Sequence, residues 1–567
     1  MRYRSSQGCQ TGDTELKYDG TGDLPSGFGR NKGLLTSEST DALDRLHDWG
    51  LGAFAEKTTS TFKVGSDYTF PMTSKVDLLG RLQERLYPDG EKLQFTHQGS
   101  ASTAVSLLRH NGTTPIDLFT GIQSHASGGL EKITHAGPGI PVVRTYELAK
   151  AQRLGSIQVG SSGSLQNLIF DYDRAGNPTA VKTSPTAEEQ KFWYDGNHRL
   201  TQAVDLRSAG YGTLEYAYDD AGNLKRKGMN ALRYGGNNDL PDAVTTVYFN
   251  AYDTAGGTPT ITDPCPSYSG ENPANDPNHD GIPTECQCGD INADGAIDVL
   301  DVQNAWLCIY NPGHPVYCNL PRCDTDNNGA CNITDALAIN NATFNHRFFE
   351  LRCSLRPEGK PVWDSQYSYA YDDEGNATTR NLGTAATTTF SWDAEGRMTG
   401  QSGFGAATFQ YDASGQRIVK QVGSAKQLFV SAEYEVDLAA GKHRKHIFVM
   451  GQPALTIQQG GIGDTPANSQ GATGEEPFHV FGDPLGTQRL TLNASGQIVQ
   501  RTIMTPYGDL HSLASGSGQP MQDSESKTPF LFTGHRYETE VDVHYMGARY
   551  YDPLAGAFLS ADPAWVD

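Results

Sequence analysis

The sequence predicts a mainly β protein, in which YD-type hairpins stack into a β-solenoid or shell with a small α-helical calcium-binding insert. Three observations predict this fold: a recurring aromatic–Asp phrase, a glycine-containing turn after most copies, and one acidic, cysteine-rich window that interrupts the repeat. The 567 residues include 63 Gly and 26 Tyr, a composition that suits β-rich chains with many tight turns.

The recurring phrase starts with an aromatic residue followed by Asp, and its copies return at nearly regular intervals in two series. The pairs of the first series are Tyr172-Asp173, Tyr194-Asp195 and Tyr218-Asp219, and those of the second are Tyr371-Asp372, Trp392-Asp393 and Tyr411-Asp412. Another aromatic residue stands two positions before each pair: Phe170, Phe192, Tyr216, Tyr369, Phe390 and Phe409. Because side chains alternate along a strand, this spacing places both rings on one face.

The residues after each pair predict a hairpin turn. In the phrase YAYDDAGNLKRK, Asp220 and Ala221 fit a type I turn, and Gly222 supplies the left-handed residue that closes a bulged hairpin. Asp219 is suited to accept hydrogen bonds from the turn amides. Leu224 then resumes the facing strand. Such a hairpin has one apolar face and is too small to be stable alone, so neighbouring units must stack to bury it.

These units resemble the hairpins of RHS/YD-repeat proteins, and the resemblance implies a spiral that forms a large hollow β-shell. Degenerate copies of the phrase occur near Tyr18, Val76 and Leu165. The stretches 481–510 and 530–563 resemble the RHS repeat-associated core domain of the same family.

Three residues differ from the usual sequence of that core. Asp542 stands where Gly is expected, His544 where an aromatic residue is common, and Ala557 where Arg is common. Asp tolerates a left-handed backbone better than most residues, so the first change is mild. We expect the other two to weaken local packing or a polar contact.

In this family the core usually continues into a self-cleavage motif and then a variable toxin. The sequence stops at DPAWVD, about where that continuation would begin, so we predict neither self-cleavage nor a toxin within these residues. We assign no catalytic role to Asp552 or Asp562. The first residues lack the apolar run of a signal peptide, so either export uses another route or the chain is a fragment of a longer protein, and we expect the fragment.

The repeat is interrupted between Asp219 and Asp372, a gap several times longer than the interval between neighbouring copies. Composition places the insert at about 258–355, a window with ten Asp, three Glu, three Arg and no Lys, a net charge of −10. Eight of the nine cysteines lie in it: Cys265, Cys286, Cys288, Cys308, Cys318, Cys323, Cys331 and Cys353. This density favours a disulfide framework in an oxidising compartment, with zinc as the rival interpretation.

The insert contains two loops whose oxygens fall at positions 1, 3, 5, 7, 9 and 12, the pattern that wraps one Ca²⁺ ion. The first set is Asp290, Asn292, Asp294, the carbonyl of Ala296, Asp298 and Asp301, with Gly295 at the bend. The second set is Asp324, Asp326, Asn328, the carbonyl of Ala330, Asn332 and Asp335, with Gly329 at the bend. An apolar helical pattern follows each loop.

The duplication and the Asp at position 12 resemble a dockerin, a calcium-folded module that binds cohesin domains. The resemblance implies that positions 10 and 11 select the partner, here Val299, Leu300, Ile333 and Thr334. Upstream, the phrase NDPNHDGIPTEC resembles a thrombospondin type 3 calcium repeat and offers a weaker, incomplete site of Asp276, Asn278 and Asp280. The insert then acts either as a structural calcium clip or as a cohesin-docking module, and a solvated acidic linker is the plainest alternative.

The net charge and the lack of known catalytic motifs argue against several classes of function. A net charge of −22 argues against nucleic acid and anionic membranes as partners, and no segment approaches the ~18 apolar residues of a membrane span. The sequence lacks a Gly-x-Ser-x-Gly elbow, a Walker-type loop and an HExxH helix, so no catalytic residue is predicted. The phrase GKHRKHIF, with His443 and His446, is interpreted as a solvated basic hairpin end rather than a metal site.

The predicted organisation is a YD-repeat shell at 1–257, a dockerin-like insert at 258–355, continued repeats at 356–474 and an RHS core at 475–567. We expect a non-catalytic extracellular or cell-envelope shell or scaffold of the RHS toxin type, which takes toxin cargo or cell-surface carbohydrate as partner. The alternative is a cohesin-binding component of a polysaccharide-degrading assembly, and a hydrolase is a minority interpretation.

Overall fold

The computed structural model describes most of the chain outside the acidic insert. The described ranges are 2–3, 14–18, 35–40, 43–51, 56–64, 68–99, 101–147, 151–184, 187–207, 210–228, 230–235, 242–248, 251–252, 260–261, 299–310, 366–381, 387–403, 406–412, 414–461 and 475–562, with the single positions 291, 323, 331, 333, 336, 337 and 339.

One antiparallel sheet of 35 strands dominates the structure. Each strand pairs with the next along the chain, without crossovers, from β1 to β21 and again from β24 to β37. This is the mainly β architecture that the repeated hairpins predict.

The first part of this sheet comprises β1 (Arg2–Tyr3), β2 (Thr14–Tyr18), β3 (Leu35–Thr40), β4 (Leu43–Leu51), β5 (Glu56–Val64), β6 (Tyr68–Val76), β7 (Leu82–Leu86), β8 (Lys92–Gln98), β9 (Ala101–Leu108), β10 (Ile116–Ser124), β11 (Leu130–His135), β12 (Ile140–Glu147), β13 (Arg153–Val159), β14 (Gln166–Tyr172), β15 (Pro178–Ser184), β16 (Ala187–Tyr194), β17 (Leu200–Asp205), β18 (Gly212–Tyr218), β19 (Leu224–Lys227), β20 (Asn230–Tyr234) and β21 (Val244–Tyr248). A 3-10 turn, η2 (Ser161–Gly163), precedes β14.

The second part comprises β24 (Gln366–Tyr371), β25 (Ala377–Asn381), β26 (Thr387–Trp392), β27 (Met398–Ser402), β28 (Ala407–Tyr411), β29 (Arg417–Val422), β30 (Ala425–Ser431), β31 (Tyr434–Asp437), β32 (Lys442–Val449), β33 (Gln452–Gly460), β34 (Glu476–Gly482), β35 (Gln488–Leu492), β36 (Ile498–Met504) and β37 (Leu510–Ala514). The chain then forms η7 (Asp523–Glu525), η8 (Phe532–Gly534) and a separate four-stranded sheet of β38 (Arg536–Glu538), β39 (Val543–Tyr545), β40 (Tyr550–Asp552) and β41 (Ala557–Phe558).

The hairpin turns have the geometry that the sequence predicts. After β18, the carboxylate of Asp219 accepts hydrogen bonds from the backbone N–H of Asn223 (2.8 Å) and from its side-chain amide (3.1 Å). Gly222 has φ of 98°, and the register shifts by one residue beside it, as in a bulged hairpin. In the unit of Tyr194, His198 takes the left-handed position instead, with φ of 63°.

The aromatic residue of each YD pair also ties its hairpin to the preceding one. The Tyr218 hydroxyl donates to the carbonyl of Leu200 at 2.9 Å, and the Trp392 indole N–H donates to that of Ala377 at 2.7 Å. The Tyr172, Tyr194, Tyr371 and Tyr411 hydroxyls make equivalent bonds to the strand before their own. The repeated aromatic residue therefore packs one face and also fixes the spacing between units.

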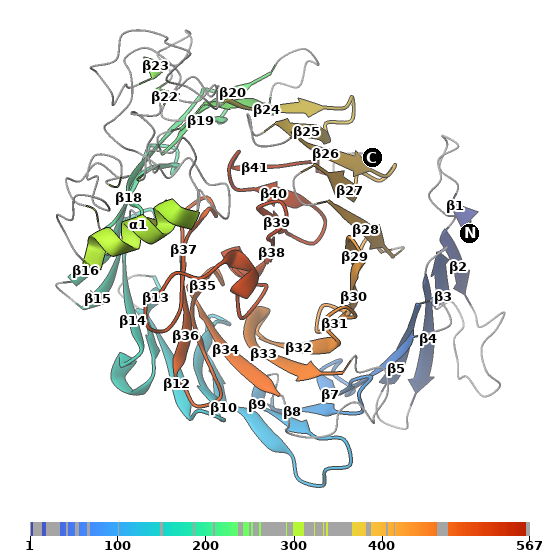
Figure 1. Cartoon of the computed structure of the whole chain (residues 1–567). Coiled ribbons are helices and arrows are strands. Elements are labelled where there is room, and N and C mark those ends of the chain that lie inside the picture. The colour runs from blue at the N-terminus through green and yellow to red at the C-terminus, as the bar shows by residue number, and fades with distance from the viewer. Residues whose placement is uncertain are drawn as a thin grey trace.

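The sheet winds into a spiral (Figure 1). It starts at β1–β5, passes through β8–β14 and β16–β20, turns over at β24–β27 and returns through β28–β33. The last strands then lie against the first turn, because His479 on β34 contacts His135 on β11, and Arg489 on β35 pairs with Glu189 on β16. The four-stranded sheet β38–β41 lies inside this spiral.

The apolar core follows the spiral in two main clusters. One joins the first turn to the returning strands and includes Phe62, Phe119 and Leu455. The other packs the middle strands against the C-terminal sheet and includes Tyr216 and Val543. The aromatic residues two positions before the YD pairs lie in these clusters, as the spacing predicts.

The insert leaves the sheet at one place. Strand β21 pairs directly with β24, and Thr246 stands opposite Ser368, so the sheet continues across the interruption. Between them, β22 (Ala251–Tyr252) and β23 (Thr260–Ile261) form a separate two-stranded sheet, and α1 (Val299–Tyr310) is the longest described helix. None of the helices that the structure describes combines the length and apolarity that a bilayer crossing requires.

Candidate functional site

Buried charged residues cluster where the returning strands contact the first turn of the spiral. We call these contacts seams. At the first seam, the turn between β7 and β8 brings Asp89 and Glu91 to Lys445 on β32. All three residues are fully buried, at 0% exposure. The Lys445 ammonium contacts both carboxylates and the side-chain oxygen of Gln459, the last at 2.9 Å. We call this group, completed by His443, Arg109 and Glu475, the first clasp.

The remaining members complete the hydrogen bonding of the first clasp. The Nε2 of His443 lies 3.1 Å from Asp89 Oδ2 and 2.8 Å from Gln459 Oε1. Arg109 donates to Glu91 at 2.7 Å and pairs closely with Glu475. Burial disfavours the charged form of Asp89, but Lys445 and His443 together outweigh burial, so the pKa of Asp89 lies below its ordinary value.

A second seam contact is a pair of buried histidines. The Nδ1 atoms of His135 and His479 lie 2.9 Å apart, and the rings of Phe119 and Phe481 lie 4.9 and 4.6 Å from that of His135. Among the described residues, no carboxylate contributes to the pKa of either ring. Burial lowers the pKa of His479 to about 4, and burial together with its neighbour lowers that of His135 well below the ordinary value.

This pair predicts a loss of stability in mild acid. The unfolded chain binds a proton on each histidine near its ordinary pKa of about 6.5, whereas folded His479 does so only near pH 4. Stability is therefore complete above about pH 6.5 and falls as pH drops toward 4, by about 3 kcal/mol for His479 alone. Denaturant unfolding at pH 7 and pH 5 measures this loss. The free energy of unfolding should change less between the two pH values in His479→Phe than in the unsubstituted chain. The exposed-histidine variant His198→Asn should keep the full change, and equal changes in both variants would contradict this assignment.

The C-terminal sheet is anchored by a further buried ion cluster, which we call the core anchor. Arg417 on β29 pairs with Glu538 on β38, and both are nearly inaccessible. The Lys420 ammonium bridges Glu538 and Glu540 at 2.6 Å each. Burial opposes ionisation of Glu538, but Arg417 and Lys420 prevail and lower its pKa to about 2. The Arg417 guanidinium also lies 4.2 Å from the centre of the Tyr545 ring.

Asp552 has a structural environment of the same kind. It is fully buried on β40, where its carboxylate accepts hydrogen bonds at 3.0 Å from the Arg380 guanidinium and from the Tyr369 hydroxyl. Asp562 is partly exposed and pairs with Arg549 at 2.9 Å. These partners hold both carboxylates in ion pairs.

The three unusual core residues are accommodated individually. Asp542 adopts the left-handed conformation expected of it, with φ of 53°, and accepts a hydrogen bond of 2.6 Å from the Tyr537 hydroxyl. His544 was expected to weaken packing, but it is fully buried among rings and its Nε2 bonds the carbonyl of Gly508 at 2.8 Å. Ala557 lies in β41, opposite Asp552.

The prediction for the basic stretch 441–448 is wrong. His443 and His446 were interpreted as part of a solvated basic hairpin end, but both are buried on β32. His443 meets Asp89, and His446 lies 3.4 Å from Glu435. The physical reason is that carboxylates from other segments face both sides of this basic strand, Asp89 and Glu91 from the turn between β7 and β8 and Glu435 from β31.

Most of the predicted calcium ligands lie outside the described residues: Asp290, Asn292, Asp294, Ala296, Asp298, Asp324, Asp326, Asn328, Ala330, Asn332 and Asp335, with the weaker Asp276, Asn278 and Asp280. The position-12 residue Asp301 lies in the first turn of α1, as do Val299 and Leu300. Ile333 is partly buried, and Thr334 lies outside the described residues.

The described residues of the insert form a small core. Val302 and Ala305 on α1 pack with Ala336 and Ile339, which stand at the same places after the second loop as Val302 and Ala305 do after the first. A disulfide joins Cys323 and Cys331, and their sulfurs lie near that of Cys308. Equivalent positions after the two loops therefore share one core, which fits a duplicated loop–helix unit. The other cysteines of the insert lie outside the described residues.

The seam residues could not be found from local patterns. Asp89 and Lys445 are 356 positions apart, and nothing in the phrase YPDGEK or in GKHRKHIF indicates the partner. The one available indication was the density of basic residues on a strand whose alternation places half of them inward. Every charged member of the first clasp has a partner of opposite charge, so this cluster joins strands from distant parts of the chain.

Comparison with known proteins supports the fold. No protein-family model matches the sequence. The tRNA nuclease WapA of Bacillus subtilis is 24% identical over 206 residues, which cover 35% of this chain and 8% of that protein. The toxin subunit YenC1 of Yersinia entomophaga is 26% identical over 195 residues, which cover 31% of this chain and 19% of that subunit. The aligned part is thus less than a fifth of the length of these relatives.

Solved structures match over nearly the whole chain. The structure of a Photorhabdus luminescens Tc holotoxin pore matches with a TM-score of 0.60 at 14% identity. The match covers 100% of this chain and 24% of the matched toxin chain. A TcdB2-TccC3-Cdc42 crystal structure has a TM-score of 0.57 at 15% identity and covers 94% of this chain and 23% of that chain. The chain therefore has the β-rich shell fold found in Tc toxin structures.

Proposed function

We propose that this chain is a wall segment of an RHS-type shell that encloses a toxic polypeptide outside the producing cell or at its envelope. One observation carries the proposal: a single sheet winds back on itself, and ion pairs join its turns, of which the Lys445–Asp89 pair is fully buried. The similarity to toxin-complex structures and to a toxin subunit supports the same role. In this proposal the chain supplies the container and no catalysis.

Protease protection of a passenger tests this function. A short unstructured reporter with several protease sites would be attached after Asp567, and its cleavage compared with that of the free reporter. We expect cleavage at least ten times slower in the fusion, because a shell excludes the protease. The same reporter attached before Met1 serves as the control for non-specific slowing. Equal cleavage of the free and C-terminal reporters would overturn the container role.

We also propose that the insert is a calcium-folded clip. The shared core of α1 with Ala336 and Ile339 supports a duplicated loop–helix unit, and the oxygen-rich loops before each helix are suited to Ca²⁺. Calcium would remove the repulsion between the carboxylates, so binding becomes part of folding. The ligands would be the twelve loop positions from Asp290 to Asp335 named above.

Calcium removal should unfold this insert and spare the shell. With free Ca²⁺ at about 100 times Kd, each site adds about 2.7 kcal/mol to the stability of the insert. Hydrogen exchange of the α1 peptide should therefore accelerate strongly on addition of EGTA, while that of β11 stays unchanged. Asp290→Ala with Asp324→Ala should reproduce this result in calcium, and Asp276→Ala should do so weakly. If neither calcium removal nor these substitutions changed the hydrogen-exchange rate of α1, the calcium-folded clip would be contradicted.

A further inference from the structure

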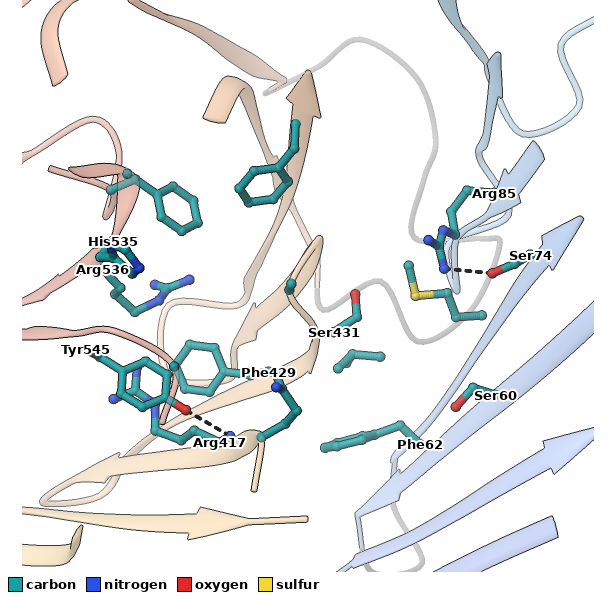
Figure 2. Close-up of a pocket in the computed structure, with 18 of the residues that line it drawn as sticks. Ser60, Phe62, Ser74, Arg85, Arg417, Phe429, Ser431, His535, Arg536 and Tyr545 are labelled. Atoms are coloured by element: carbon teal, nitrogen blue, oxygen red, sulfur yellow. Dashed lines mark hydrogen bonds between the residues drawn. The ribbon is translucent and has the colours of Figure 1, made fainter. Parts of the chain in front are cut away.

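A cavity of about 410 Å³ lies at a third place where the turns of the spiral meet. Its walls come from β5, β6 and β7 of the first turn, from β29, β30 and β32, and from the segment that contains η8, β38 and β39 (Figure 2). This volume falls in the range of ligand pockets. At the two seams described above, paired side chains bridge the turns directly.

The cavity has cationic walls in an acidic protein. The described residues that line it include Arg85, Arg417 and Arg536 but no Asp or Glu. Their partners Glu433, Glu538 and Glu435 lie outside the lining, so the guanidinium groups border the space. Figure 2 shows Arg85 on one side of the cavity and Arg417 with Arg536 on the other. Each guanidinium is paired with one of these carboxylates, and its remaining N–H groups can donate to an anionic group in the space.

Arg85 is the guanidinium best placed to receive a ligand. It keeps 23% side-chain exposure, compared with 1% for Arg417. Its Nη1 donates to Ser74 at 2.7 Å and its Nη2 lies 3.2 Å from Glu433. Its Nε is inaccessible, but Nη1 and Nη2 each carry a second N–H that bonds none of the described residues. A guanidinium with unused donors is suited to bind a carboxylate.

Between the arginines, the cavity has an aromatic and hydroxyl surface. Phe62, Phe429 and Phe530 supply apolar contact area. Ser60 and Ser431 add hydroxyl groups on two walls, and Ser60 shares its face of β5 with Phe62 because side chains alternate along a strand. Hydroxyls beside an apolar surface can bond the amide groups of a peptide whose side chain enters the ring-lined part.

We propose that this cavity binds a short polypeptide segment in which an acidic residue adjoins an aromatic one, with the carboxylate on Arg85 and the ring among the phenylalanines. The inference deepens the proposed function, since an enclosed polypeptide would supply such a segment. Binding of a separate peptide does not require enclosure, so the two ideas can fail independently.

Titration calorimetry with three probes tests the site on the full chain. The probes are acetyl-Ser-Phe-Asp-Ser-amide, the same peptide with Asn for Asp, and 3-phenylpropanoate. We expect the Asp peptide to bind at least ten times more tightly than either other probe. Equal affinity of the two peptides would overturn the carboxylate role of Arg85, and equal affinity of 3-phenylpropanoate would overturn recognition of a peptide.

Variants then place the binding in this cavity. Arg85→Met should weaken the Asp peptide at least tenfold and the Asn peptide less than twofold, because only the carboxylate contact is lost. Arg226→Met, which removes a comparably exposed arginine paired with Glu215 on β18, should change neither. Ser60→Trp should fill the space and weaken both peptides. Unchanged binding of the Asp peptide in Arg85→Met or Ser60→Trp overturns the proposal, and thermal unfolding confirms that each variant is folded.

Discussion

Replacing Lys445 by Met should cost about 3–5 kcal/mol of folding free energy. The substitution leaves Asp89 and Glu91 fully buried and facing each other without the ammonium that neutralises both. Removal of one partner from a buried ion cluster is far more costly than loss of a surface pair, because the remaining charges cannot regain water. The pKa of Asp89, which Lys445 keeps low, should rise, and the seam should loosen. The midpoint of denaturant unfolding at pH 7 measures the loss.

A neighbouring lysine supplies the control for this result. Lys442 starts the same strand, β32, and is exposed. Lys442→Met should change stability by less than about 0.5 kcal/mol, as surface substitutions usually do. If Lys445→Met proved as mild as Lys442→Met, the turns of the spiral would not depend on the first clasp.

Replacing Arg417 by Met should have an effect of similar size on a different part of the molecule. Arg417 is 1% exposed, pairs with Glu538 and stacks on the rings of Phe429 and Tyr545 at 4.5 and 4.2 Å. Its loss leaves Glu538 with Lys420 as its remaining close partner and removes the packing that joins β29 to β38 and β39. We expect a loss of about 3–5 kcal/mol, with the pKa of Glu538 raised from about 2.

Hydrogen exchange locates this second effect. Peptides from β38 and β39 should exchange much faster in Arg417→Met, whereas peptides from β11 should be unchanged. Arg549→Met is the matched control in the same region, because its pair with Asp562 is partly exposed and contributes at most about 1 kcal/mol. Uniform acceleration along the whole chain would mean that the core anchor does not act locally.

The repeated hairpins could be predicted because each one is determined by residues that are close together in the sequence. Asp219, Gly222 and Leu224 lie close together in the chain, and the turn that they form depends on backbone preferences and hydrogen bonds inside that span. The same reasoning predicted the left-handed Asp542. The rings at Phe170 and Phe409 were placed correctly because alternation along a strand determines which residues share a face.

The contacts at the seams could not be predicted because they depend on residues spread over the whole chain. His135 meets His479 across 344 positions, and that contact depends on the curvature accumulated by many strands. No single hairpin specifies that curvature. The buried state of His443 follows from the same contact geometry, which explains why a local interpretation placed it in solvent. The cationic cavity was missed for the same reason, since Arg85 and Arg536 come from opposite ends of the chain.

A double-mutant cycle between Glu91 and Lys445 tests most directly whether buried ion pairs join the turns of the wound sheet. Glu91→Gln, Lys445→Met and the double variant would be compared by denaturant unfolding. Residues in contact should show a coupling free energy of about 1–3 kcal/mol, although 354 positions separate them in the chain. Additive effects of the two substitutions would show that these turns do not meet in solution, and the spiral described above would be wrong.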